Sequence, residues 1–138
     1  MNASFVVDAS LAIAWLIPSQ SSPATDRLLD EATIGCLAVP ALWLFEIVNS
    51  LTVQLRRRKI SSDEYLGARL FLDKLRVSID EEGMRFATTR IADLAVEHNL
   101  TFYDAAYLEL AIRKQIPLAS RDADLNRAAK RCGVPVLL

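Results

Sequence analysis

The sequence predicts an α/β domain in which a parallel sheet is covered by helices on both faces. Short apolar runs alternate with helical patterns along nearly the whole chain, as strands and helices do in such folds. These runs contain few polar residues, which is typical of strands that are buried on both faces. A chain of 138 residues also suffices for one domain with one core, so we expect a single domain over residues 1–138.

The elements of the first half follow from apolar periodicity and from the positions of proline and serine. Residues 4–7 are expected to form a strand that stops at Asp8, and residues 9–16 a short helix that is closed by Pro18. A helix over about 22–32, a strand over 36–39 and a long helix over about 41–58 are expected to follow. The first half of the long helix is apolar nearly all round, so we expect it to be buried on most sides.

The second half continues the alternation of helices and strands. Ser61 and Glu64 have the spacing of a helix cap and its third helical residue, so a helix should begin there and reach about residue 75. The other expected elements are a strand over 77–79, helices over 83–97 and 103–113, a strand over 116–120, a helix over 125–130 and a strand over 134–137. Because Pro135 has no N–H group to donate, the last strand is expected at an edge of the sheet.

Composition limits the classes of function. The formal net charge is −1, so any binding of nucleic acid must come from a local basic patch. Hydrophobic residues are 52% of the chain, a slight surplus over the usual fraction, which indicates that a partner or a second copy covers apolar surface. No apolar run approaches the roughly 20 residues of a membrane helix, and no signal peptide is visible. We therefore expect a cytoplasmic protein in which Cys36 and Cys132 are buried free thiols.

Four acidic side chains lie where such a fold gathers functional groups, beyond the carboxyl ends of the strands. Asp8 directly follows the first strand, and Asp122 follows the fourth. Glu46 interrupts an apolar run over 41–48, and Asp104 lies in the first turn of another apolar helix. Carboxylates that converge repel one another by about 1 to 4 kcal/mol per pair at 4 Å. Such a cluster persists when it binds a hard cation, and oxygen-only ligands favour Mg²⁺ or Mn²⁺ over Zn²⁺.

Each acid also has a structural interpretation. Asp8 could cap the helix that follows it, and Asp122 or Asp124 could cap the last helix. Asp104 comes three residues after Thr101, a loose match to a capping box. Glu46 could belong to a narrow polar stripe on the surface of its helix, together with Asn49.

The segments that contain these acids resemble the motifs of PIN-domain proteins, and their order and spacing are similar to those of VapC-type toxin ribonucleases. The segments are Val6-Val7-Asp8-Ala9-Ser10, Phe45-Glu46-Ile47-Val48-Asn49, Phe102-Tyr103-Asp104-Ala105-Ala106-Tyr107 and Leu118-Ala119-Ser120-Arg121-Asp122-Ala123-Asp124-Leu125. The resemblance implies a three-layer α/β/α sandwich with a central parallel sheet and Mg²⁺-dependent RNA cleavage. It also implies a homodimer and a VapB-type antitoxin as partner.

The same resemblance assigns roles to residues. Asp8, Glu46, Asp104 and Asp122 match the acidic quartet of the family. Ser10 and Asn49 match supporting polar positions, and Ser120 stands where Thr is usual. Asp124 is an additional acid to which the match gives no role.

Basic and aromatic residues have weaker interpretations. Arg56, Arg57, Arg58 and Lys59 end the long helix, where cations are favoured by the helix dipole and could also contact RNA phosphates. Arg121 and the pair Arg113-Lys114 are lesser candidates for such contacts. His98 is expected on the solvated surface. The side chains of Trp15, Trp43 and Phe45 are expected in the core or, failing that, against a partner.

The predicted reaction is hydrolysis of an RNA phosphodiester by metal-activated water. Mg²⁺, for which Mn²⁺ is expected to substitute, would be held by Asp8 and Asp104, with Glu46 acting through water and Asp122 completing the site. One alternative is a phosphotransfer domain on a similar sheet, although a dehalogenase-type phosphatase needs a second Asp where Ser10 stands. The other alternative is a PIN-like RNA-binding or interaction module without turnover.

Overall fold

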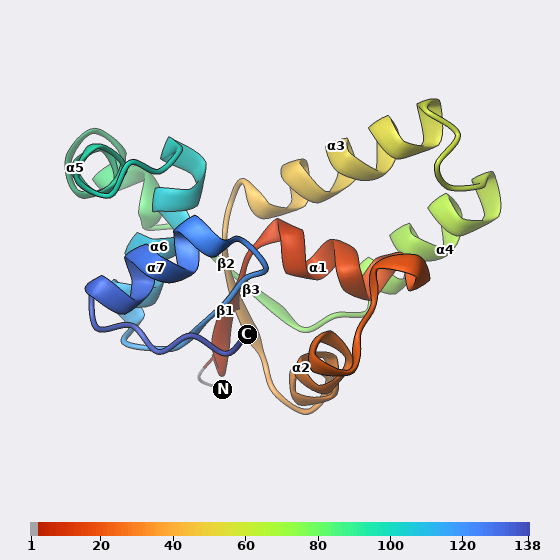
Figure 1. Ribbon diagram of the computed structural model, residues 1–138, viewed down its shortest axis with the longest axis horizontal. Coiled ribbons are helices and arrows are strands. Elements are labelled where there is room, and N and C mark those ends of the chain that lie inside the picture. Colours follow the sequence, from red (N-terminus) through yellow and green to blue (C-terminus); the bar gives the residue numbers. More distant parts are fainter. Residues whose placement is uncertain (1–2) are drawn as a thin grey trace.

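The computed structural model describes residues 3–138 and shows a parallel sheet with helices on both faces (Figure 1). The strands of the four-stranded sheet lie in the order β3-β2-β1-β4, and each neighbouring pair is parallel. They are β1 (Phe5–Val7), β2 (Leu37–Pro40), β3 (Val77–Asp80) and β4 (Leu118–Ala119). The α/β class is therefore confirmed.

Helices enclose the sheet as the outer layers of a sandwich. Those on one side are α1 (Ala9–Leu16), α2 (Pro23–Ile34), α3 (Trp43–Arg56) and α4 (Ser62–Leu72), and those on the other are α5 (Ala92–Glu97), α6 (Phe102–Lys114) and α7 (Ala123–Arg131). Helix α6 packs against β1, β2 and β4, whereas α1 packs against α2, α3 and α4. Figure 1 shows the two groups of helices on either side of the strands, as expected for a three-layer sandwich.

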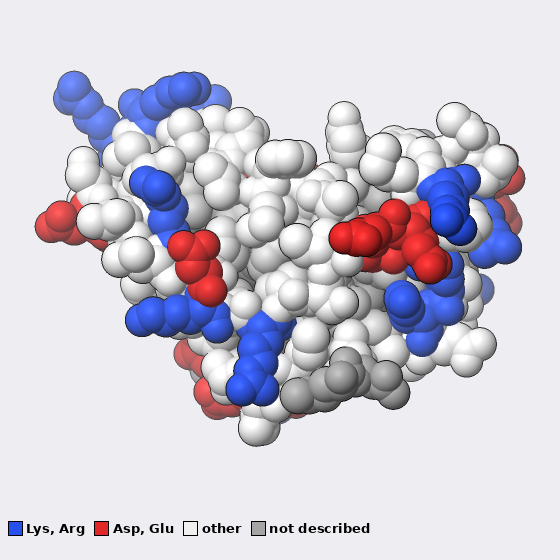
Figure 2. All heavy atoms as spheres, turned by 180° about the vertical axis from the view of Figure 1, so that it is seen from behind, with Lys and Arg blue, Asp and Glu red and all other residues white. Residues whose placement is uncertain are grey.

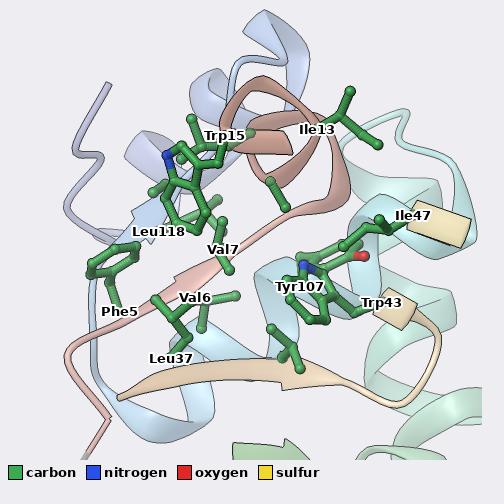
Figure 3. Packing of buried hydrophobic residues seen from close by; sticks show 14 of the residues in the cluster. Phe5, Val6, Val7, Ile13, Trp15, Leu37, Trp43, Ile47, Tyr107 and Leu118 are labelled. Carbon is green, nitrogen blue, oxygen red and sulfur yellow. The ribbon is translucent and has the colours of Figure 1, made fainter. Parts of the chain in front are cut away.

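The core forms where the strands meet these helices. Phe5, Val6 and Val7 are at most 1% exposed, and Trp43 and Tyr107 are equally buried. Figure 3 shows Trp43 beside Tyr107 and Ile47, with Trp15 nearer to Val7. Complete burial of one such apolar side chain stabilises a fold by roughly 1.5 to 3 kcal/mol.

The expectation of a long helix buried on most sides is wrong. Helix α3 begins at Trp43 and buries a single stripe, namely Trp43, Ile47 and Leu51. Leu44 and Val48 are exposed, and Phe45 is 79% exposed, so Phe45 is not a core aromatic. The reason is the arrangement of α3 and α4, which form a hairpin that extends beyond the sheet (Figure 1) and leaves the outer face of α3 uncovered.

Two further segments differ from expectation. The expected final strand is reduced to a bridge between Val136 and Leu118 at the β4 edge, where the Leu118 N–H donates to the carbonyl of Pro135. The expected helix over 83–97 divides into a 3-10 turn (Gly83–Phe86), a π turn (Ala87–Ile91) and α5. In residues 3–138 no helix is both long and apolar enough to cross a membrane.

Candidate active site

Asp8 lies at the carboxyl end of β1 and is only 3% exposed. Its carboxylate accepts hydrogen bonds from the Leu11 N–H at 3.0 Å, from the Ser10 hydroxyl at 2.8 Å and from the Ser120 hydroxyl at 2.5 Å. The first of these bonds makes Asp8 the N-cap of α1. Burial raises the pKa of Asp8, and the three hydrogen bonds oppose that rise. The capping interpretation is confirmed, and it coexists with a place at the sheet edge.

Ser120 ties the end of β4 to the end of β1. Its fully buried hydroxyl donates to Asp8 and accepts from the backbone N–H of Asp122 at 2.9 Å. Asp122 in turn caps α7, because its Oδ1 accepts from the Leu125 N–H at 2.9 Å. The strand ends and the helix starts are therefore fixed together by short hydrogen bonds between side chains and backbone.

Glu46 lies in the first turn of α3 and has no capping role. Its Oε1 accepts a 2.5 Å hydrogen bond from the hydroxyl of Tyr107 on α6. Burial raises the pKa of Glu46, the Tyr107 hydrogen bond lowers it, and the charge of Asp8 raises it. Burial and the neighbouring Glu46 also raise the pKa of Tyr107 above its ordinary value.

Tyr107 is the site residue that the sequence reasoning missed. It stands three residues after Asp104, and residues at this spacing lie on one face of a helix. That spacing was the available signal, but an aromatic residue in an apolar helix is equally typical of a core position.

Asp104 occupies the first turn of α6, where Thr101 is the N-cap and accepts from the Asp104 N–H at 3.1 Å. The carboxylate of Asp104 is therefore not needed as the cap. The pKa of Asp104 is raised to about 6, first by burial and then by the charges of Asp122, Asp8 and Glu46. Since each of the other three acids contributes to this rise, the fold places all three within electrostatic reach of Asp104.

The chemistry of these donors suits a hard divalent cation. Carboxylate and hydroxyl oxygens from Asp8, Glu46, Asp104, Asp122 and Ser120 are the ligand types that Mg²⁺ and Mn²⁺ prefer. Within residues 3–138, no group of three or more His, Cys, Asp or Glu side chains has an arrangement that could hold a metal ion as it stands. The residues fit such an ion by donor type and by charge, but not by their present arrangement. Binding would therefore require the carboxylates to draw together.

A cleft of about 280 Å³ lies beside the acids, between α1 and α3. Its lining consists of Ala9, Ser10, Ile13, Gln20, Glu46, Ser50, Gln54 and Arg121. Asn49 is exposed and is not part of this lining, which instead includes its neighbour Ser50. Asp124 is also exposed and forms an ion pair with Arg127.

The remaining candidates lie away from the acids. Arg56, Arg57, Arg58 and Lys59 are exposed at the end of α3. Arg113 forms ion pairs with Asp80 at 2.6 Å and with Glu109 at 2.7 Å, so its charge is satisfied within the fold. His98 is half-buried and its Nε2 lies 3.3 Å from Cys132 Sγ, so the expectation of a solvated surface histidine is wrong. Neither cysteine is fully buried.

Comparisons with known proteins agree on the fold. The PIN domain family matches the chain over residues 5–131. The crystal structure of PAE2754 from Pyrobaculum aerophilum is similar, with a TM-score of 0.71, 24% identity and coverage of 98% of this chain and 84% of that one. VapBC2 from Rickettsia felis, bound to a DNA fragment from their promoter, gives a TM-score of 0.65, 10% identity and 96% coverage of both chains. FitAcB from Neisseria gonorrhoeae gives 0.64, 20% identity and coverage of 96% of this chain and 95% of that one. None of the curated proteins matches the chain significantly.

Proposed function

The chain belongs to the PIN-domain family, and from this premise we propose that it is a metal-dependent endoribonuclease, the toxin of a VapBC-type toxin–antitoxin pair. The observation that supports the proposal is the placement of four acids by separate elements. Asp8 caps α1 at the end of β1, Asp122 caps α7, and Glu46 and Asp104 lie in the first turns of α3 and α6. The charges of the other three acids all raise the pKa of Asp104. Helix capping does not explain the positions of Glu46 and Asp104, since neither acts as the N-cap of its helix.

In the proposed site, Asp8 and Asp104 would hold Mg²⁺, and Asp122 would complete the set of ligands. Mg²⁺ bound there would lower the pKa of a water molecule and offset the charge that develops on the phosphate oxygens. Ser10 and Ser120 fix the orientation of the Asp8 carboxylate through their hydrogen bonds. Glu46, oriented by Tyr107, positions the attacking water. Because water is the nucleophile, the ribose 2′-hydroxyl is not required. Water bonds to the phosphorus while the bond to the 3′-oxygen breaks, and that oxygen takes up a proton, so the products carry 5′-phosphate and 3′-hydroxyl ends.

A cleavage assay on single-stranded RNA tests this proposal. Wild-type protein should cleave with Mg²⁺ or Mn²⁺ and should lose activity in EDTA, and Asp104→Asn should be inactive. Asp124→Asn is the matched control, because Asp124 is an acid of the same region that is exposed and paired with Arg127. A 2′,3′-cyclic phosphate as the main product would contradict the mechanism. Metal-independent RNA binding without cleavage would favour an interaction module without turnover.

The proposed partners are a VapB-type antitoxin and a second copy of the chain. The exposed outer face of α3 supports a partner, because it joins α4 in an apolar groove of about 410 Å³. Leu44, Phe45, Val48, Leu66 and Leu70 line this groove and are all exposed. The 52% hydrophobic composition agrees with apolar surface left for a partner. The tryptophans Trp15 and Trp43 contribute nothing to it, since both are buried in the core.

A further inference from the structure

Arg121 crosses the edge of the cleft beside the acids and is held there from two sides. Its Nε donates to the backbone carbonyl of Ser10 at 2.8 Å, and one terminal nitrogen donates to Gln20 Oε1 at 2.9 Å. Its backbone N–H also donates to the Ser10 hydroxyl at 3.3 Å, and that hydroxyl binds Asp8. In the described part of the chain, Arg121 forms no ion pair with a carboxylate. A fixed guanidinium with N–H groups left over is therefore presented beside the acid cluster.

The opposite wall of the cleft is a row of polar side chains on α3. Glu46, Ser50 and Gln54 are spaced by four residues, so they follow one another along one face of the helix, about 6 Å apart. The amide of Gln54 donates to the Ser50 hydroxyl at 3.2 Å, which keeps the two side chains together. The row leads from the acids toward the end of α3, where basic side chains gather, at the upper left of Figure 2.

We infer that this cleft is a phosphate-binding subsite for single-stranded RNA, in which Arg121 contacts the phosphate next to the one that is cleaved. The inference rests on the proposed function. It adds a binding site and the direction in which the RNA strand leaves the acids, along α3 toward its end. A planar guanidinium that is already oriented can donate two parallel hydrogen bonds to a phosphate. A phosphate suits this guanidinium because it supplies the negative charge that no carboxylate supplies to Arg121 within residues 3–138.

The size and lining of the cleft favour a single strand over a duplex. A volume of about 280 Å³ lies just below the roughly 300–1,000 Å³ of small-ligand pockets, so the cleft has room for about one nucleotide unit. Duplex RNA is recognised by shape across wide grooves, whereas single strands are recognised nucleotide by nucleotide. The hydroxyl and amide groups of Ser50, Gln54 and Gln20 can bond to ribose and base edges of such a unit.

Salt-dependent binding tests the subsite separately from cleavage. The probe is a fluorescein-labelled oligouridine of about eight nucleotides, within the roughly 4–16 nucleotides of single-strand sites. Fluorescence anisotropy is measured at constant Mg²⁺ in an Asp104→Asn background, so that no cleavage occurs. Arg121→Ala should weaken binding about tenfold, as expected for the loss of a hydrogen bond between charged groups. The slope of log K against log salt should fall by about 0.7, the contribution of one single-strand phosphate contact.

Two comparisons make the result decisive. Arg121→Lys keeps the charge and should keep the slope, and Arg127→Ala, which removes an exposed arginine of the same region, should change neither the affinity nor the slope. An unchanged slope in Arg121→Ala, with or without a lower melting temperature, would show a structural role and overturn the inference. An equal effect on a duplex RNA of the same length would overturn the single-strand assignment. If the slope falls as expected while wild-type protein cleaves no RNA, the subsite stands and the proposed nuclease activity fails.

Discussion

The hydroxyl of Tyr107 donates a 2.5 Å hydrogen bond to Oε1 of Glu46 and thereby joins α6 to α3 at the acid cluster. Tyr107 is 1% exposed and packs beside Trp43 and Ile47, so its ring is fixed by the core (Figure 3). The hydrogen bond in turn holds the half-buried carboxylate of Glu46 in place. Glu46 therefore owes its orientation to a residue that lies 61 positions away in the sequence.

Tyr107→Phe should reduce catalysis more than it reduces stability. The ring and its packing remain, so the free energy of unfolding should fall only by the contribution of one hydrogen bond to a charged group, about 1.5 to 3 kcal/mol. Without the Tyr107 bond, which lowers the pKa of Glu46, that pKa should rise. The acidic limb of the kcat profile should then move to higher pH, which a residue that only packs would not cause. An unchanged pH profile in stopped-time cleavage assays would show that Tyr107 acts through packing alone.

The raised pKa of Asp104 predicts an unusual dependence of stability on pH in the metal-free protein. The pKa of Asp104 is about 6 in the folded chain against 3.8 as the ordinary value, so the folded state binds a proton more tightly than the unfolded state. The contribution of Asp104 to the free energy of unfolding should therefore fall as pH rises from about 4 to about 6. Below that window both states are protonated, and above it the destabilisation is complete.

The difference between wild type and Asp104→Asn isolates this effect from the other titrating groups. Denaturant melts of the two metal-free proteins should give curves that diverge between pH 4 and 6, with the variant relatively more stable at pH 7. Parallel curves across this range would show that Asp104 is free of its acidic neighbours. Mg²⁺ binding should weaken as pH falls through the same range, because a carboxylate that binds the metal must be deprotonated.

How far the sequence predicts this site depends on the range of the interactions involved. Asp8 and Asp122 could be found because a carboxylate directly after a strand and before a helix is a local pattern. The helix start at Ser61 was predictable for the same reason, since Ser61 and Glu64 form a capping box. The Tyr107–Glu46 bond was not, because it depends on how α6 packs against α3.

The exposed face of α3 could not be predicted from the sequence for a similar reason. An apolar run indicates that side chains avoid water, but it does not indicate which neighbouring element covers them. Trp43 and Ile47 are covered by the chain itself, whereas Phe45 between them is left exposed. The residue that the pattern assigned to the core therefore points to a surface that another molecule could cover.

Substitution of Phe45 should test that surface without unfolding the protein. Phe45 is 79% exposed, so Phe45→Glu removes little buried area and should leave the melting temperature nearly unchanged. If the face of α3 is covered in a dimer, light scattering at micromolar concentration should show a dimer for wild type and a monomer for Phe45→Glu. Ile34→Glu is a matched control, because Ile34 is also 79% exposed but lies on α2. A wild-type monomer, or a Phe45→Glu dimer, would contradict this interface.

Stability with and without Mg²⁺ separates a metal-binding cluster from acids that serve only the fold. Asp8 and Asp122 accept hydrogen bonds as caps, so their removal costs about 0.5 to 2 kcal/mol in either case and is uninformative. Asp104 and Glu46 do not act as N-caps, so Asp104→Asn and Glu46→Gln are the informative variants. Each keeps the shape of the side chain and removes one of the charges that repel. Metal-free Asp104→Asn should be at least as stable as wild type, whereas Glu46→Gln also weakens the hydrogen bond from Tyr107 and is compared only for its response to Mg²⁺. Mg²⁺ at a hundredfold excess over Kd should stabilise wild type by about 2.7 kcal/mol, and both variants should lose most of that gain. If thermal melts show no Mg²⁺-dependent rise for wild type while Asp104→Asn melts lower, these acids stabilise the fold and the proposed active site is wrong.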